Sequence, residues 1–278
     1  MLTDYHVHLR PDDPGTPAAA YFTTANADRY REVASDRGIV ELGVAEHVHR
    51  FEQALDVWQH PFWRESARDD LGEYCRFVRE ETDLRLGIEA DWVSGREDRM
   101  AALLDDHEWD YVIGSVHFIR DRGVDSDYGG DWDIWDTARS PDEVWKAYFE
   151  TLAHAAESGL YDIMAHPDLV KVWGTERPLP EKDPRYYYEP AVEAMAGAGV
   201  AAEVSTAGLR KAAGEIYPAP ALMEMLVDAG VPIALSSDAH VPDQLGFRYE
   251  DALTFLADHG VKEIATFQGR TRRMEPIG

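Results

Sequence analysis

The sequence predicts an α/β protein whose parallel strands close into a single TIM-like barrel. Short apolar runs alternate with helix-type segments along all 278 residues, with no break in composition and no Gly/Ser-rich linker. Such alternation is typical of a parallel sheet, and seven or eight units in one domain favour a barrel over an open sheet. Residues that bind metals also recur where the predicted strands end, and barrels of this type carry their sites at the C-terminal ends of their strands.

The N-terminal half begins with an apolar run in which Leu2, Tyr5, Val7 and Leu9 predict a strand. A loop rich in proline and aspartate follows over residues 10–17. Apolar periodicity and a stop at Gly38 then predict a helix. Helices are predicted at 18–38, 69–82 and 96–107, and further strands at 39–47, 84–92 and 110–118.

In the C-terminal half, Ser140, Pro141 and Glu143 form a capping box with proline at the first helical position, which predicts a helix start. That helix runs to about Gly159. Strands are predicted at 161–166, 200–206, 232–237 and 263–267, with helices ending near 197–199 and spanning 219–230 and 249–260. Three long segments, at about 50–68, 119–139 and 167–185, are expected to be loops, and loops of this length are usually functional or mobile.

The composition indicates a globular protein with a substantial core, since 45% of the residues are hydrophobic and 11% aromatic. Fifty-three acidic residues face 27 basic ones, of which five are lysines, for a formal net charge of −26. Such a surface repels phosphate backbones, so nucleic acid is a poor partner. The charge fits a protein kept soluble in a salt-rich cytoplasm, where screening makes it tolerable, or is simply that of an acidic protein.

The sequence gives no sign of a membrane or secreted location. No apolar run approaches the roughly 20 residues needed to span a bilayer. The N-terminus carries Asp4 and His6 where a signal peptide needs a basic and then an apolar segment. The single cysteine, Cys75, excludes an intrachain disulfide and is expected to be a buried helix residue. We therefore expect a cytoplasmic protein without a membrane partner.

Potential metal ligands are concentrated at the ends of the predicted strands. His6 and His8 lie two apart on the first strand, so their side chains leave the same face. Alone, this pair could equally be two hydrogen-bonded core histidines. Later strands, however, end in similar residues, namely His47, Glu89, His117, His166, Asp238 and His240. Asp12 or Asp13, in the loop after the first strand, could add an oxygen ligand. The recurrence predicts a metal centre.

Six histidines and two carboxylates exceed what one metal ion can use. We therefore expect two or three ions with a bridging carboxylate, a donor set that suits zinc, manganese or iron. Metal ions about 3.5–4 Å apart activate a water molecule and stabilise both oxygens of an in-line displacement. Hydrolysis of a phosphate ester is the reaction that this arrangement serves most naturally, although amide or ring hydrolysis would use similar residues.

The remaining histidines need no role in the centre. Surface or helix-dipole roles suffice for four that fall in loops, in helices or at helix ends, namely His60, His107, His154 and His259. His49 alternates with His47 and is a weaker candidate ligand.

Six short motifs resemble those of the PHP family of metal-dependent phosphoesterases. They begin at Asp4 (DYHVH), Ala45 (AEH), Gly87 (GIEAD), Gly114 (GSVHF), Ala165 (AHPDL) and Ser237 (SDAH). Residues 205–210 (STAGLR) and 215–220 (EIYPAP) resemble the histidinol-phosphatase branch of this family. The matches span residues 4 to about 247 in the family's order, which is nearly the whole chain.

The resemblance implies a distorted seven-stranded barrel, with residues 1–278 forming one PHP catalytic domain that holds three metal ions. One ion would be held by His6, His8, Glu89 and Asp238, and a second by Glu89, His117 and His166. His47 and His240 would hold the third, whose remaining ligand in the family is often a histidine after the first strand. This chain has only Asp12 and Asp13 there. The candidate catalytic residues among the ligands are Glu89, Asp238 and His240.

The implied reaction is hydrolysis of L-histidinol phosphate to L-histidinol and phosphate, in histidine biosynthesis and without a phosphoenzyme. Arg210 is a candidate phosphate clamp because its planar guanidinium can bind two oxygens, and Lys171 is a second. One alternative is a PHP phosphoesterase for another small phosphate ester or for nucleic-acid ends, although the acidic surface disfavours nucleic acid. The other is a non-catalytic metal-binding member, which the intact ligand set disfavours.

Overall fold

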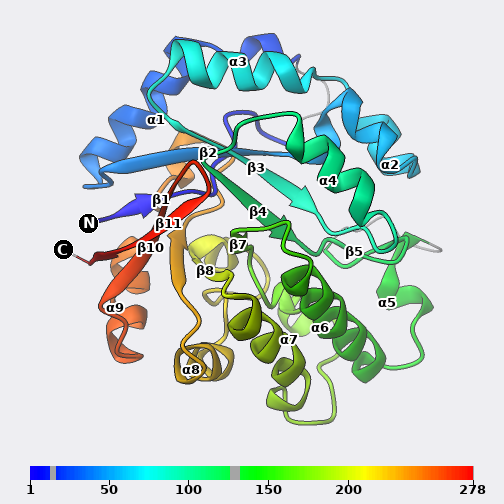
Figure 1. The fold of residues 1–278 in the computed structure, drawn as a ribbon. Helices are drawn as coiled ribbons and strands as arrows, with labels where there is room; N and C mark the ends of the chain where they lie inside the picture. Colours follow the sequence, from blue (N-terminus) through cyan, green and yellow to red (C-terminus); the bar gives the residue numbers. More distant parts are fainter. Residues whose placement is uncertain (13–16, 126–131, 278) are drawn as a thin grey trace.

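The computed structural model describes residues 1–12, 17–125 and 132–277, and within them seven parallel strands form a barrel-like sheet surrounded by helices (Figure 1). Their order around the sheet is β1, β2, β3, β4, β7, β8 and β9, with every neighbouring pair parallel. The bounds are Thr3–Asp4 (β1), Glu41–His47 (β2), Arg85–Asp91 (β3), Tyr111–Ser115 (β4), Ile163–Met164 (β7), Ala201–Ser205 (β8) and Ile233–Ser236 (β9). The predicted fold class is confirmed.

The barrel is nearly closed where the segment after β1 meets the segment after β9. Val7 and Ala239 form an isolated parallel bridge, and the His8 amide donates to the Ala239 carbonyl at 2.7 Å. The prediction of one continuous strand over residues 2–9 is wrong, because β1 ends at Asp4. Beyond this bridge the backbone leaves the sheet, since the amides of Leu9 and Arg10 donate to the Glu46 carboxylate instead of a neighbouring strand.

Seven helices of the described residues lie where the sequence predicts helices. They are Thr24–Asp36 (α1), Leu71–Glu81 (α3), Glu97–Asp105 (α4), Pro141–Glu157 (α6), Arg185–Ala198 (α7), Pro220–Asp228 (α8) and Tyr249–Asp258 (α9). The predicted cap of α6 is confirmed, since the Ser140 hydroxyl accepts from the Glu143 amide. The helix expected over 18–38 begins later, because the Thr23 side chain caps α1 by accepting from the Asn26 amide.

The three predicted loops contain short elements. These are Glu52–Asp56 (η3) and Pro61–Ser66 (α2) in the first, Phe118–Ile119 (β5), Arg122–Gly123 (β6) and Ile134–Thr137 (α5) in the second, and Leu169–Lys171 (η5) and Gly174–Glu176 (η6) in the third. Elements of two to six residues are too short to show an apolar period, so the sequence pattern could not reveal them. Residues 126–131 of the second segment lie outside the described ranges.

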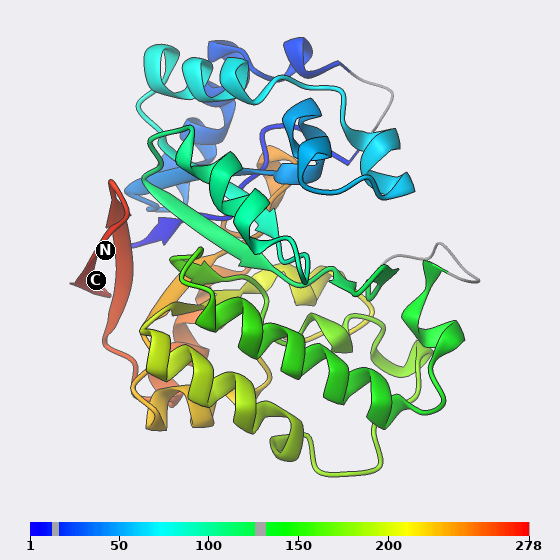
Figure 2. The same ribbon diagram turned by 45° about the vertical axis from the view of Figure 1, so that its right-hand side comes forward.

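A C-terminal hairpin corrects the expectation of an eighth barrel strand. Glu263–Gln268 (β10) pairs antiparallel with Thr271–Pro276 (β11), which the sequence did not predict, and neither belongs to the seven-stranded sheet. The hairpin lies beside both chain ends in each view (Figures 1 and 2). The Met1 ammonium donates to the Pro276 carbonyl, which ties the N-terminus to β11.

Large aromatic side chains fill the barrel interior next to the C-terminal hairpin. Tyr111 approaches the backbone of β2 and β3 so closely that a Cβ on Gly43 or Gly87 would lie under 3 Å from its ring. Its hydroxyl donates to the Tyr5 carbonyl, and Phe267 of β10 packs edge-on against the Tyr5 ring. The hairpin therefore supplies part of the interior core.

Cys75 is buried in α3, as expected. Across residues 1–12, 17–125 and 132–277, every helix falls short of the length and apolar character that a membrane crossing requires.

Candidate metal centre

The structure brings the eight expected ligands together at the C-terminal ends of the strands. His6 and His8 follow β1, His47 ends β2, and Glu89 is in the last part of β3. The other four come two to four residues after β4, β7 and β9, namely His117, His166, Asp238 and His240. Asp13 lies outside the described residues. The C-terminal ends of the parallel strands lie at one rim of the barrel, so these side chains lie together although His6 and His240 are 234 positions apart in the sequence.

The ligand atoms form four overlapping groups, within each of which the atoms lie no more than 4.8 Å apart. The groups are His8, His47 and His240; His6, His8 and Asp238; His6, Glu89 and His166; and His47, Glu89 and His117. Each group is a set of imidazole nitrogens and carboxylate oxygens, which are donors for zinc, manganese and iron. The arrangement could therefore hold more than one metal ion.

Glu89 lies at the middle of the centre, and its two oxygens face different histidines. Oε2 lies 3.3 Å from His6 Nε2 and 3.6 Å from His8 Nε2. Oε1 lies 3.4 Å from both His117 Nε2 and His166 Nε2. A carboxylate placed between two sets of imidazoles has the geometry of a bridging ligand.

Asp238 completes the set on the His6 side, where its Oδ1 lies 3.7 Å from His6 Nε2 and 3.5 Å from His8 Nε2. Its backbone adopts φ 51°, and His166 has φ 24°, so two candidate ligands sit in conformations that L-residues rarely adopt. Such backbone is retained where the surrounding structure enforces it, and it is concentrated at functional sites.

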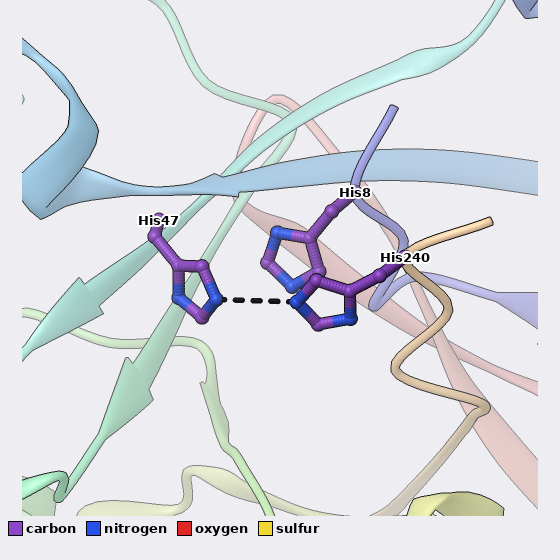
Figure 3. Close-up of side chains that lie close together, drawn as sticks. All are labelled: His8, His47 and His240. Atoms are coloured by element: carbon purple, nitrogen blue, oxygen red, sulfur yellow. Dashed lines mark hydrogen bonds between the residues drawn. The ribbon is translucent and has the colours of Figure 1, made fainter. Parts of the chain in front are cut away.

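The third group stands at the outer side of the centre. His8 lies stacked against both His47 and His240, with ring centroids 4.2 and 4.1 Å apart (Figure 3). His47 Nε2 and His240 Nε2 face each other at 3.3 Å. Asp12 Oδ2 lies 3.3 Å from His240 Nε2, while its Oδ1 accepts from Arg50 Nη2 at 2.5 Å. Asp12 could therefore supply an oxygen ligand to a metal ion held by His47 and His240.

The buried polar atoms of the centre test whether metal ions fit. His6 Nε2, both ring nitrogens of His8 and Glu89 Oε1 have no hydrogen-bond partner in the described part of the chain, and Glu89 Oε2 is in close contact with His47 Nδ1. Unpaired buried polar atoms are costly, and in native structures each needs an explanation. A carboxylate oxygen and one nitrogen of each neutral imidazole can offer a lone pair to a metal ion, and such atoms converge within 4.8 Å of one another here, so the residues fit metal ions.

Burial and neighbouring groups shift the pKa values of the ligand residues. Burial disfavours the charged form of Glu89, but the neighbouring imidazoles of His47, His6 and His117 hold its pKa well below the usual value. Burial and the adjacent His240 and His47 hold the pKa of His8 well below its usual value. An ionised Glu89 and a neutral His8 are in the protonation states that metal ligands require, whereas the carboxylates of Glu203 and Glu89 outweigh burial and raise the pKa of His6, and Glu89 likewise raises that of His117.

Two carboxylates behind the ligands were missed by sequence reasoning. Glu203, buried on β8, lies 2.8 Å from His6 Nδ1 and also accepts from the His166 amide and the Ser236 hydroxyl. Asp91, at the end of β3, lies 2.6 Å from His117 Nδ1. A carboxylate on the far nitrogen of a metal-binding histidine fixes its tautomer and orientation.

His49 and His60 lie beside the centre without joining it. His49 Nδ1 lies 3.4 Å from Asp91 Oδ2 on its buried side, and His49 is in none of the four ligand groups. The surface role expected for His60 is wrong, since this side chain is buried and caps α2 by accepting from the Phe62 amide. The sequence predicts a loop at about 50–68, so the start of α2 at this position was not expected.

Two cavities open onto the centre. One of about 580 Å³ lies beside His47, His49 and His117 and is lined further by Arg50, Arg68, Phe62, Phe118, Glu65 and Asp125. A smaller one of about 220 Å³ reaches the ligands themselves and is lined by His166, Asp238, His240, Tyr217 and Lys211, among others. Asp12, His47, His117 and Asp125 border both cavities.

The two candidate phosphate-binding cations have different surroundings. Arg210 Nη2 donates to the carbonyls of Ser237 and Asp238 at 2.9 and 2.8 Å, whereas Nη1 finds no partner among the described residues. Lys171 Nζ has three acceptors, each at 2.9 Å, which are Asp168, Glu215 and the Ile216 carbonyl. The three ammonium hydrogens are thereby used, so this geometry does not support Lys171 as a phosphate ligand.

The fold and the site together define an α/β barrel with a metal-binding centre at the C-terminal ends of its strands. The PHP domain profile matches residues 20–207, which is more than half of the chain. A protein named "Probable histidinol-phosphatase" from Deinococcus radiodurans is 34% identical over 283 aligned residues, covering 99% of each chain. The chain therefore belongs to the PHP family.

Two further comparisons agree with this assignment. The "Histidinol-phosphatase" of Bacillus subtilis is 23% identical over 265 residues, covering 89% of this chain and 96% of that one. The crystal structure of histidinol phosphate phosphatase from Lactococcus lactis, complexed with zinc, L-histidinol and phosphate, has a TM-score of 0.71 at 18% identity, with 98% of each chain covered. At 18% identity, the similarity to the Lactococcus lactis structure is one of fold alone.

Proposed function

We propose that the protein is a metal-dependent phosphatase that hydrolyses L-histidinol phosphate to L-histidinol and phosphate, with residues 1–278 acting as one catalytic domain. The observation that carries the proposal is the bridging position of Glu89, whose two oxygens face separate imidazole sets. Full-length similarity to proteins named histidinol-phosphatase supports the choice of substrate.

The ligand residues would hold two or three divalent ions. His6, His8, Glu89 and Asp238 would hold the first, Glu89, His117 and His166 the second, and His47, His240 and Asp12 the third. When bound, these ions would activate water and neutralise the phosphoryl oxygens. The chain contributes orientation, since Glu203 and Asp91 fix the far nitrogens of His6 and His117. Asp13 remains an alternative to Asp12, and zinc, manganese and iron all suit the donors.

The two cavities suggest how the substrate would lie. We propose that the phosphate lies in the smaller cavity against Asp238 and His240. Arg210, whose Nη1 has no partner among the described residues, is the candidate donor to it. The aminoalcohol and imidazole would occupy the larger cavity, where Phe62 and Phe118 offer aromatic surface. Glu65 and Asp125 line that cavity and would attract the substrate's ammonium group.

The test is metal analysis of the purified protein together with phosphate release from L-histidinol phosphate. We expect at least two transition-metal ions per chain and turnover of histidinol phosphate well above that of a panel of other phosphomonoesters. Preferential turnover of another ester would keep the enzyme class and replace the substrate. Tight metal binding without turnover of any ester would favour a non-catalytic member.

A further inference from the structure

Tyr217 is held rigidly beside the metal centre by its backbone and its ring. Its amide and carbonyl exchange hydrogen bonds with Ser205 at the end of β8, at 3.0 and 2.7 Å. The ring packs over Gly208, where a Cβ would lie 3.1–3.2 Å from two ring carbons. On the other side the ring meets His166 edge-on, with centroids 6.2 Å apart. These contacts leave the hydroxyl little freedom of position.

The hydroxyl of Tyr217 is buried but has no hydrogen-bond partner within the described residues, although only 1% of the residue is exposed. Several other buried tyrosines are satisfied. Tyr30 donates to the His8 carbonyl, Tyr74 to the carbonyls of Val44 and Gly87, and Tyr249 to the Thr3 carbonyl. A buried polar group without a partner destabilises a fold, so the exception calls for a partner from outside the chain.

The position of the hydroxyl indicates what that partner is. Tyr217 lines the 220 Å³ cavity together with His166, Asp238 and His240, where the phosphate group is placed above. A phenol has a pKa of about 10 and keeps its proton at neutral pH, so it is a donor, while a phosphoryl oxygen is an acceptor.

We propose that the Tyr217 hydroxyl donates a hydrogen bond to a non-bridging phosphoryl oxygen of the bound substrate, and that this contact is the reason an unpaired hydroxyl is kept in the core. The inference rests on the proposed phosphatase function. It assigns to Tyr217 a role that is separate from the metal ligands and from Arg210.

The test is Tyr217→Phe, which removes one oxygen and leaves the ring packing intact. A hydrogen bond to a charged group should be lost, so kcat/KM should fall roughly 10- to 100-fold. Calorimetric titration of metal-loaded protein with inorganic phosphate should show a dissociation constant raised at least tenfold. Metal content should not change. Because the lost hydroxyl had no partner, the melting temperature of the metal-free protein should stay the same or rise.

The control is Tyr74→Phe, whose hydroxyl donates to the carbonyls of Val44 and Gly87 and which belongs to none of the ligand groups and lines neither cavity. This variant should melt lower and bind phosphate normally. Phosphate affinity of Tyr217→Phe within twofold of the parent, or a lowered metal content, would overturn the inference. If the parent fails to hydrolyse histidinol phosphate while Tyr217→Phe still binds phosphate more weakly, the proposed substrate is wrong and the role of Tyr217 stands.

Discussion

Glu203→Gln tests whether the buried carboxylate of β8 organises the metal centre. The substitution keeps the size of the side chain but replaces one acceptor oxygen with an NH2 group. In the protein, one Glu203 oxygen accepts from His6 Nδ1 and the Ser236 hydroxyl, and the other accepts from the His166 amide at 2.6 Å. A glutamine cannot satisfy both sides, because its NH2 group must face a donor on one of them.

The magnitude follows from these contacts. A hydrogen bond to a charged group contributes about 1.5–3 kcal/mol, and at about 2–4 °C per kcal/mol the metal-free variant should melt roughly 3–12 °C lower. His6 also loses the anion that orients its ring, and loss of such a partner lowers metal affinity about 10- to 100-fold. Ser236→Ala removes one of the three contacts and should show a smaller effect on both measurements.

The assay is a competition titration of zinc against a chelator of known affinity, paired with thermal unfolding of the metal-free protein. Glu193→Gln, an exposed carboxylate on α7, is the matched control and should behave like the parent. Glu203→Gln with zinc affinity within twofold of that control and an unchanged melting temperature would refute the role assigned to Glu203.

Three other outcomes are expected. Glu89→Ala should abolish turnover and lower metal content, because two imidazole sets lose their common carboxylate; near-normal activity would show that Glu89 is not the bridge. Arg210→Ala should cut kcat/KM roughly 10- to 100-fold at unchanged metal content, with Lys restoring only part; kinetics within twofold of the parent would remove it from the site. With a net charge of −26, the melting temperature should rise markedly between about 0.01 M and molar salt, as the Debye length falls from roughly 30 Å to 3 Å; a flat profile would argue against salt adaptation.

The barrel and its rim of ligands could be predicted because each depends on local pattern. Strands β2 and β3 contain uncharged stretches at residues 42–45 and 86–88, and His47 and Glu89 follow those stretches within two residues. The end of the first strand could not be predicted, since β1 ends at Asp4 and only the isolated bridge of Val7 to Ala239 follows before Glu46, distant in sequence, accepts from the amides of Leu9 and Arg10. The β10–β11 hairpin was missed because its outer strand is exposed and carries no apolar alternation.

Glu203 and Asp91, the two carboxylates behind the ligands, could have been found from the sequence. Glu203 interrupts the apolar strand Ala201–Ser205, and a charge in a buried strand requires a partner. Asp91 shares the face of Glu89 by the two-residue period of a strand. The roles of Arg210 and Lys171 could not be separated from sequence alone, because both are cations in loops and only their acceptors differ.

The C-terminal hairpin has a consequence for the order of events during synthesis. Phe267 of β10 packs on Tyr5 near the start of the chain, and its amide donates to the Tyr5 hydroxyl at 3.2 Å. The interior of the barrel therefore stays open to water on the ribosome until residues 263–276 have emerged. His6 and His8 adjoin Tyr5, and they meet Asp238 only when the ends of the sheet come together. We expect the nascent chain to acquire its full complement of metal after translation has passed the hairpin, so that a stalled chain would be a poor competitor for the cell's transition-metal ions.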